Sequence, residues 1–143
     1  MTQASRFAPW INRLVLSAAA FIFSTIGFRY IADPVRAAAA TGVTLGSGLA
    51  STTTRIGFGA FPLAFALFSF ACLLSNRRLR AGVSLVATVV ATAIAVRLFS
   101  IAADGATPQS TRLFAPEIVI LILALSGLFL EAARSRRHTG GAA

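Results

Sequence analysis

Four long apolar runs, separated by polar segments, dominate the pattern of the chain. They predict four helices, at about residues 10–32, 55–74, 81–101 and 114–132. An α-helix needs about 20 residues to cross the hydrocarbon core of a bilayer. Trp10 and Tyr30 bracket the first run at the depth where aromatic side chains meet lipid headgroups. The pattern therefore predicts an all-α polytopic membrane protein, a bundle of four transmembrane helices.

The first run also has an alternative interpretation as a signal peptide, because Arg6 and Arg13 precede its apolar core. The run is long for a signal peptide core, and the small-residue tract Arg36–Ala40 lies late for a cleavage site. We therefore expect an uncleaved membrane anchor.

The segments between the runs carry helix and turn signals. Asp is a good N-cap and Pro suits the first helical position, so Asp33 and Pro34 predict a short surface helix at Val35–Ala40 that ends at Gly42. The stretch Gly42–Thr54 is rich in Gly, Ser and Thr and predicts a flexible loop. The segment Ala102–Ala115 predicts a polar loop.

Two features inside the helices bear on packing. Pro62 removes the hydrogen-bond donor for the carbonyl of Phe58, which predicts a bend in the second helix. In the third helix, small residues share one broad arc, and small residues let helix backbones approach closely in lipid. The arc contains Ser84, Ala87, Thr88, Ala91, Thr92 and Ala95.

The composition agrees with a lipid environment. Hydrophobic residues make up 57% of the chain and charged residues 12%, whereas soluble domains carry about 25% charged residues. We expect one transmembrane domain at 1–133 and a disordered, basic and Gly-rich tail at 134–143. Cysteine and histidine occur once each, at Cys72 and His138, so we expect no metal site.

The net charge of +9 comes from arginine, since the chain has no lysine. The arginines lie between the apolar runs and form no stripe with interleaved aromatics, so we expect no nucleic-acid partner. Eight of them lie in the N-terminus, the connection after the second helix and the tail, against five elsewhere. The positive-inside rule then predicts a multi-pass protein of the cell (inner) membrane with both termini in the cytoplasm.

Ionisable residues from all four helices fall in the same predicted leaflet, and Asp104 lies in an adjoining loop. Ionisable side chains at membrane depth are costly and usually pair or line a polar cavity. Arg97 and Glu117 should meet, because a short connection joins their helices. The candidate binding cluster consists of Arg29, Arg55, Arg97, Asp104 and Glu117. It contains no predicted catalytic residue.

A purely structural explanation of this cluster is also open. Arginines near helix ends can extend to the headgroups at little cost. Glu117, predicted in the first turn of its helix, is favoured there by the helix macrodipole alone. An ion pair between Arg97 and Glu117 would also serve helix packing without any ligand.

Several short motifs occur in a characteristic order. They are residues 29–34 (RYIADP), 55–62 (RIGFGAFP), 97–100 (RLFS), 104–105 (DG) and 116–117 (PE). Over roughly residues 14–133 this order resembles the bacterial four-helix membrane family catalogued as domain of unknown function 4345, and more distantly DoxX-like proteins. The resemblance implies the four-helix architecture, but no particular activity. It also implies, as recurring family features, Arg55, Arg97, Asp104, Gly105 and Glu117.

The leading hypothesis for function is a non-enzymatic accessory or binding subunit. Its expected partners are the lipid bilayer, an anionic small ligand or lipid headgroup, and another membrane protein or a second copy of the chain. A first alternative is a DoxX-like component of a quinone-linked redox system, with a quinone near Arg97 as its cofactor. A second is a small oligomeric transporter, although no acidic residue lies near the predicted bilayer midplane.

Overall fold

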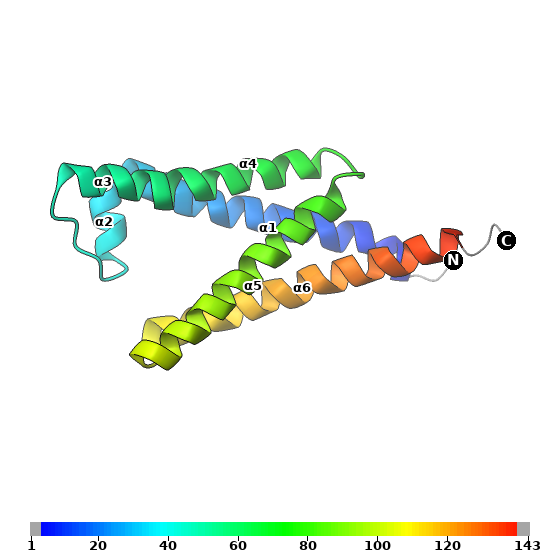
Figure 1. Cartoon of the computed structure of the whole chain (residues 1–143). Helices are drawn as coiled ribbons and strands as arrows, with labels where there is room; N and C mark the ends of the chain where they lie inside the picture. The colour runs from blue at the N-terminus through cyan, green and yellow to red at the C-terminus, as the bar shows by residue number, and fades with distance from the viewer. Residues whose placement is uncertain (1–3, 140–143) are drawn as a thin grey trace. The chain divides into compact units, whose positions relative to one another are not determined.

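The structure is a computed structural model that describes residues 4–139, with the side chains of residues 9–108, 111, 114–130 and 132. Throughout residues 4–139 the chain is helical between short connections and forms no strand (Figure 1). The predicted all-α class is confirmed. The elements are α1 (Ala4–Ala32), α2 (Pro34–Ala39), α3 (Gly48–Thr54), the π-helix η1 (Arg55–Ala60), α4 (Phe61–Leu73), α5 (Leu79–Asp104) and α6 (Pro108–Thr139).

Three helical segments within the described chain are long and apolar enough to cross a membrane. They are Pro9–Ala32, Gly48–Leu73 and Leu79–Asp104. The apolar part of α6, Phe114–Leu130, is shorter. Three of the four predicted spans are therefore supported by length and composition.

The predicted short helix after Asp33 is confirmed as α2 (Pro34–Ala39), whereas its position at the membrane surface stays a prediction. A carboxylate oxygen of Asp33 accepts a hydrogen bond from the backbone N–H of Arg36 at 3.0 Å, and Pro34 occupies the first helical position. Gly42 follows the helix with a φ of +82°, a conformation that favours glycine.

The loop predicted over Gly42–Thr54 is wrong in its second half, which forms α3. The Ser47 hydroxyl caps this helix by accepting from the N–H of Ala50 at 3.1 Å. The Thr52 hydroxyl donates to the carbonyl of Gly48 at 3.1 Å. Ser and Thr are common in loops, but here they cap the helix or form hydrogen bonds back to its carbonyls.

The loop predicted over Ala102–Ala115 is also wrong for most of its length. Helix α5 continues to Asp104 and ends at Gly105, whose φ is +90°. Pro108 already begins α6, so the connection between the two helices has three residues. The tail predicted to be disordered is helical as far as Thr139, and residues 140–143 lie outside the described part.

The bend predicted around Pro62 is not tested by any measured angle, but the structure forms a π-helix just before this proline. Segment η1 occupies residues 55–60, and the N–H of Phe61 donates to the carbonyl of Ile56, five residues back. Proline has no backbone N–H and cannot donate the usual helical hydrogen bond. A wider turn just before Pro62 accommodates this missing bond. The sequence did not predict this π-helix, and the bend itself stays a prediction.

The chain divides into two compact units, and one of them comprises residues 17–71. Here α1 packs closely on η1 and α4 through Gly27. A Cβ atom at this position would lie 2.9 Å from the carbonyl oxygen of Gly59 and 3.1 Å from Cβ of Leu63. Phe23 and Phe65 are near Gly27 and Leu63 in the sequence, and the centroids of their rings are 5.8 Å apart. Small residues at the crossing let the two backbones approach.

The other unit comprises residues 1–16 and 72–143. Its core holds Leu16 and Val83, both fully buried. A Cβ atom at Gly82 would lie 2.7 Å from Cβ of Cys72 and 2.9 Å from Cδ2 of Leu16. At Gly127 in α6, a Cβ atom would overlap the amide oxygen of the buried Asn12. Glycines therefore permit the close contacts of α5 and α6 with the start of α1.

The packing arc predicted on α5 is wrong, apart from Ala87. The buried face contains the larger valines, which remove more apolar surface from solvent than Ala, Ser or Thr. It comprises Leu79, Gly82, Val83, Val86, Ala87 and Val90, whereas the rest of the predicted arc is exposed.

Candidate functional site

Helices α5 and α6 pack against each other and carry the candidate site. Their three-residue connection makes them sequential antiparallel neighbours, as the sequence predicts (Figure 1). Each helix contributes one charged residue to the interface between them, Arg97 from α5 and Glu117 from α6.

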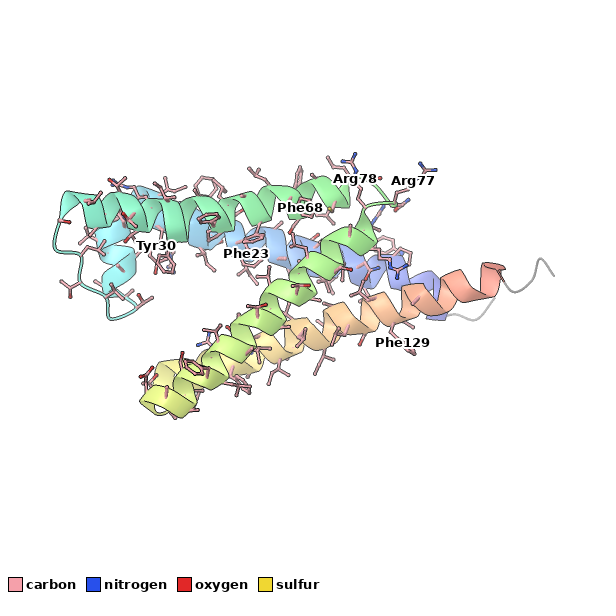
Figure 2. The ribbon with its side chains drawn as sticks, in the orientation of Figure 1. Phe23, Tyr30, Phe68, Arg77, Arg78 and Phe129 are labelled. Atoms are coloured by element: carbon pink, nitrogen blue, oxygen red, sulfur yellow. The ribbon has the colours of Figure 1, made fainter. Side chains whose placement is uncertain are left out.

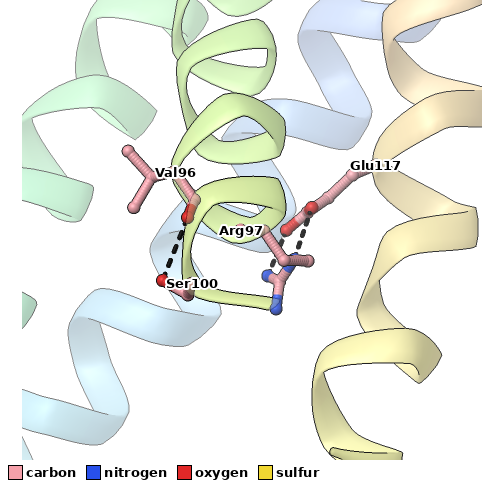
Figure 3. Close-up of polar contacts among 4 residues, drawn as sticks. All are labelled: Val96, Arg97, Ser100 and Glu117. Atoms are coloured by element: carbon pink, nitrogen blue, oxygen red, sulfur yellow. Dashed lines mark hydrogen bonds and ion pairs between the residues drawn. The ribbon is translucent and has the colours of Figure 1, made fainter. Parts of the chain in front are cut away.

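Arg97 and Glu117 form a bidentate ion pair, which confirms the prediction that they meet (Figure 3). Nε of Arg97 donates to Oε2 of Glu117 at 2.9 Å, and Nη2 donates to Oε1 at 2.5 Å. Both side chains are only 21% exposed. Two parallel charge-assisted hydrogen bonds of this kind fix orientation and are stronger than neutral hydrogen bonds.

The pair lies further inside both helices than predicted. Arg97 is seven residues before the end of α5 at Asp104, about 10 Å along the helix axis. Glu117 is nine residues after the start of α6 at Pro108, about 13 Å. The first-turn position predicted for Glu117 is therefore wrong, and the helix macrodipole, which acts within the first turn, does not account for this carboxylate.

One guanidinium nitrogen of Arg97, Nη1, takes no part in the ion pair and can bind another partner. Only Nε and Nη2 bond to Glu117, and Nη1 has no hydrogen-bond partner within the described residues. The nearby hydroxyl of Ser100 instead donates to the carbonyl of Val96 at 3.0 Å (Figure 3). The pair can thus offer a guanidinium N–H and carboxylate lone pairs to a polar ligand.

Arg55 and Arg29 lie in the unit of residues 17–71. Nε of Arg55 donates to the carbonyl of Ile31 at 3.2 Å, and Ile31 is the penultimate residue of α1. Arg55 therefore caps a carbonyl that the helix end leaves without an intrahelical donor. Arg29 is exposed in the last turn of α1, where positive charge is favourable. Within the described residues, Arg29 forms no hydrogen bond or ion pair through its side chain.

Asp104 is the last residue of α5 and is exposed. It belongs to the same unit as Arg97 and Glu117, but of the five candidates only the latter two are brought into direct contact. A ligand site built from all five residues stays a prediction.

The sequence interpretation missed a second polar contact. Nη2 of Arg13 donates to Oδ1 of Asn76 at 3.0 Å, which joins α1 to the connection between α4 and α5. Both residues lie at the ends of apolar runs on the same predicted side of the membrane, and this shared position could have indicated the contact.

The described residues include no group of three or more His, Cys, Asp or Glu side chains placed to hold a metal ion. Comparison with known proteins brings no further candidate, because no family model, curated protein or solved structure matches the chain. The family resemblance of the short motifs therefore stays an expectation, and the candidate site rests on its own geometry.

Proposed function

We propose that this chain is a non-enzymatic accessory or binding subunit of the bacterial inner membrane. In this proposal four helices cross the bilayer, both termini are cytoplasmic, and a polar or anionic headgroup binds beside the Arg97–Glu117 pair. The supporting observation is that pair itself, bidentate and largely buried between two apolar helices.

The depth of the pair favours a ligand role. Helix α5 has 26 residues, about 39 Å, against about 30 Å of hydrocarbon. If α5 is centred in the bilayer, Arg97 lies several ångströms below the hydrocarbon boundary. Two apolar residues would hold α5 against α6 at lower desolvation cost, so a charged pair at this depth suggests a function.

The geometry favours a partner that accepts a hydrogen bond. Nη1 of Arg97 carries two N–H donors, and the positive charge suits a phosphate or carboxylate oxygen. A quinone carbonyl would accept from the same atom, so the quinone-linked redox component remains the alternative function. The two candidates differ in what should be bound to the purified protein.

Mass spectrometry of the molecules that co-purify in mild detergent tests the proposal. The wild-type protein would be compared with the double variant Arg97→Leu/Glu117→Gln, which removes the pair without leaving a lone charge. Arg36→Gln, at an exposed arginine of α2, serves as the control.

We expect an anionic lipid or small anion to be enriched with the wild type and the control and depleted in the double variant. A quinone with the same dependence would replace the proposal with the redox alternative. Identical profiles for all three proteins would show that the ion pair serves helix packing alone.

A further inference from the structure

Four exposed arginines gather at the connection between α4 and α5. Arg77 and Arg78 belong to the turn and project from it (Figure 2), and Arg80 is the second residue of α5. Arg13 comes from α1, far away in sequence, and its bond to Asn76 holds it beside the turn. We call these four residues the turn arginine cluster.

The turn arginine cluster lies at the ends of three candidate membrane spans. The first span begins at Pro9, one turn before Arg13, the second ends at Leu73, and the third begins at Leu79. If these spans cross a bilayer, the side chains of the turn arginine cluster lie within about one helical turn of the depth of the lipid phosphates.

No carboxylate compensates this charge within the described residues. Glu117 is paired with Arg97, and Asp104 lies at the opposite end of α5. The first turn of α5 has no acidic residue, and its N-cap, Arg78, makes no capping hydrogen bond through its side chain. Among the side chains that the structure describes, four guanidinium groups thus present a positive surface with no carboxylate paired to it.

A cytoplasmic location of this turn would not by itself require Arg13 to lie beside the arginines of the turn. The positive-inside rule depends on the number of basic residues near the span ends, not on their mutual placement. Here residues 63 positions apart are held together by a hydrogen bond. Planar guanidinium groups from two segments suit the several oxygens of a phosphate group, which they can bind by paired N–H donors.

An apolar surface adjoins the cluster on α1. Trp10 is 70% exposed and Leu14 63% exposed, and both lie within one helical turn of Arg13. Tryptophan is typical of the membrane interface, where its ring meets the glycerol region of the lipid. A ligand that carries both a phosphate and an acyl chain matches this combination of surfaces.

We propose that the turn arginine cluster binds the phosphate headgroup of an anionic phospholipid, of the phosphatidylglycerol type, in the leaflet that surrounds the α4–α5 turn. This site is separate from the Arg97–Glu117 pair and does not depend on the function proposed for that pair. Anionic lipid would thereby be enriched around the start of α1 and the α4–α5 turn.

Trp10 provides the test, because it is the only tryptophan in the chain and lies three residues from Arg13. The full-length protein would be reconstituted into vesicles that mix phosphatidylcholine and phosphatidylglycerol. Bromine-labelled acyl chains would be placed on one lipid or the other. Quenching of Trp10 fluorescence by each labelled lipid then measures the local preference for phosphatidylglycerol.

Each arginine near an anionic headgroup contributes about 1 kcal/mol, or about fivefold in affinity. We expect a preference for phosphatidylglycerol of at least about fivefold in the wild type. Arg77→Gln should lower it by about fivefold, whereas Arg36→Gln, which also removes one exposed arginine, should leave it unchanged. Both sites are exposed, so neither change should disturb folding.

Equal quenching by the two labelled lipids in the wild type would overturn the proposal, as would equal effects of Arg77→Gln and Arg36→Gln. Added inorganic phosphate should lower the preference no more than chloride at the same ionic strength. A specific effect of phosphate would instead identify a site for a free anion. None of these results depends on Arg97, so they leave the proposed function to its own test.

Discussion

Separating Arg97 from Glu117 should destabilise the helix pair more than removing both charges. The perturbations are Arg97→Leu, Glu117→Gln and their combination. In the native protein the two charges meet through bonds of 2.5 and 2.9 Å, and each side chain is 21% exposed. A charge left behind in either single variant would therefore be largely cut off from water and without its partner.

The size of the effect follows from the geometry. At a separation of about 4 Å and an effective dielectric constant of about 20, two unit charges attract by about 4 kcal/mol, before desolvation is subtracted. Removing one partner of a buried pair costs about 3–5 kcal/mol. We expect about 3 kcal/mol for Glu117→Gln, because arginine stays charged at any accessible pH.

The two single variants should differ. A carboxylate left alone can take up a proton, so Arg97→Leu should cost less, about 2 kcal/mol. The double variant should cost about 1 kcal/mol, since no uncompensated charge remains. These values correspond to a coupling free energy of about 4 kcal/mol, within a factor of two.

The free energy of unfolding would be measured by titration with sodium dodecyl sulfate in mixed micelles, with helix content followed by circular dichroism. The combination of Arg36→Gln with Glu117→Gln is the control pair, and its effects should add, because Arg36 lies in the other unit of the chain. Additive effects of Arg97→Leu and Glu117→Gln would refute the ion pair as a stabilising contact.

Three further predictions concern topology, packing and capping. In a variant without the native cysteine, Asn76→Cys should resist an impermeant thiol reagent in intact cells while Gly46→Cys reacts; the reverse pattern would invert the proposed topology. Gly82→Ala should destabilise by about 2 kcal/mol through overpacking, whereas Gly57→Ala, where an added Cβ meets nothing within 4 Å, should be neutral or stabilising in thermal melts. Arg55→Ala should cost about 1 kcal/mol and speed amide hydrogen exchange at the C-terminal end of α1; unchanged exchange there would argue against the capping role.

The sequence by itself determined the helical class and the positions of the apolar cores of the helices. Where no water reaches a long apolar run, its backbone N–H and C=O groups must bond to one another. A helix forms all of these hydrogen bonds within one segment. Local signals also placed α2, because Asp33 and Pro34 act through neighbouring residues alone. The meeting of Arg97 and Glu117 was predictable, since a short connection between two helices leaves little choice of partner.

The helix ends depend on polar and backbone contacts, which cannot be predicted from the pattern of hydrophobic residues. Polar residues of α3 and of the first turns of α6 continue helices whose apolar cores begin later. Because both helices extend further than predicted, the Arg97–Glu117 pair lies deeper inside them. The helix macrodipole therefore no longer accounts for the position of Glu117. The α5 face that packs was likewise decided by tertiary structure, because burying Val83, Val86 and Val90 removes more apolar area than burying the small-residue arc. Arg13 and Asn76 meet only because folding joins two distant segments at one end of their helices.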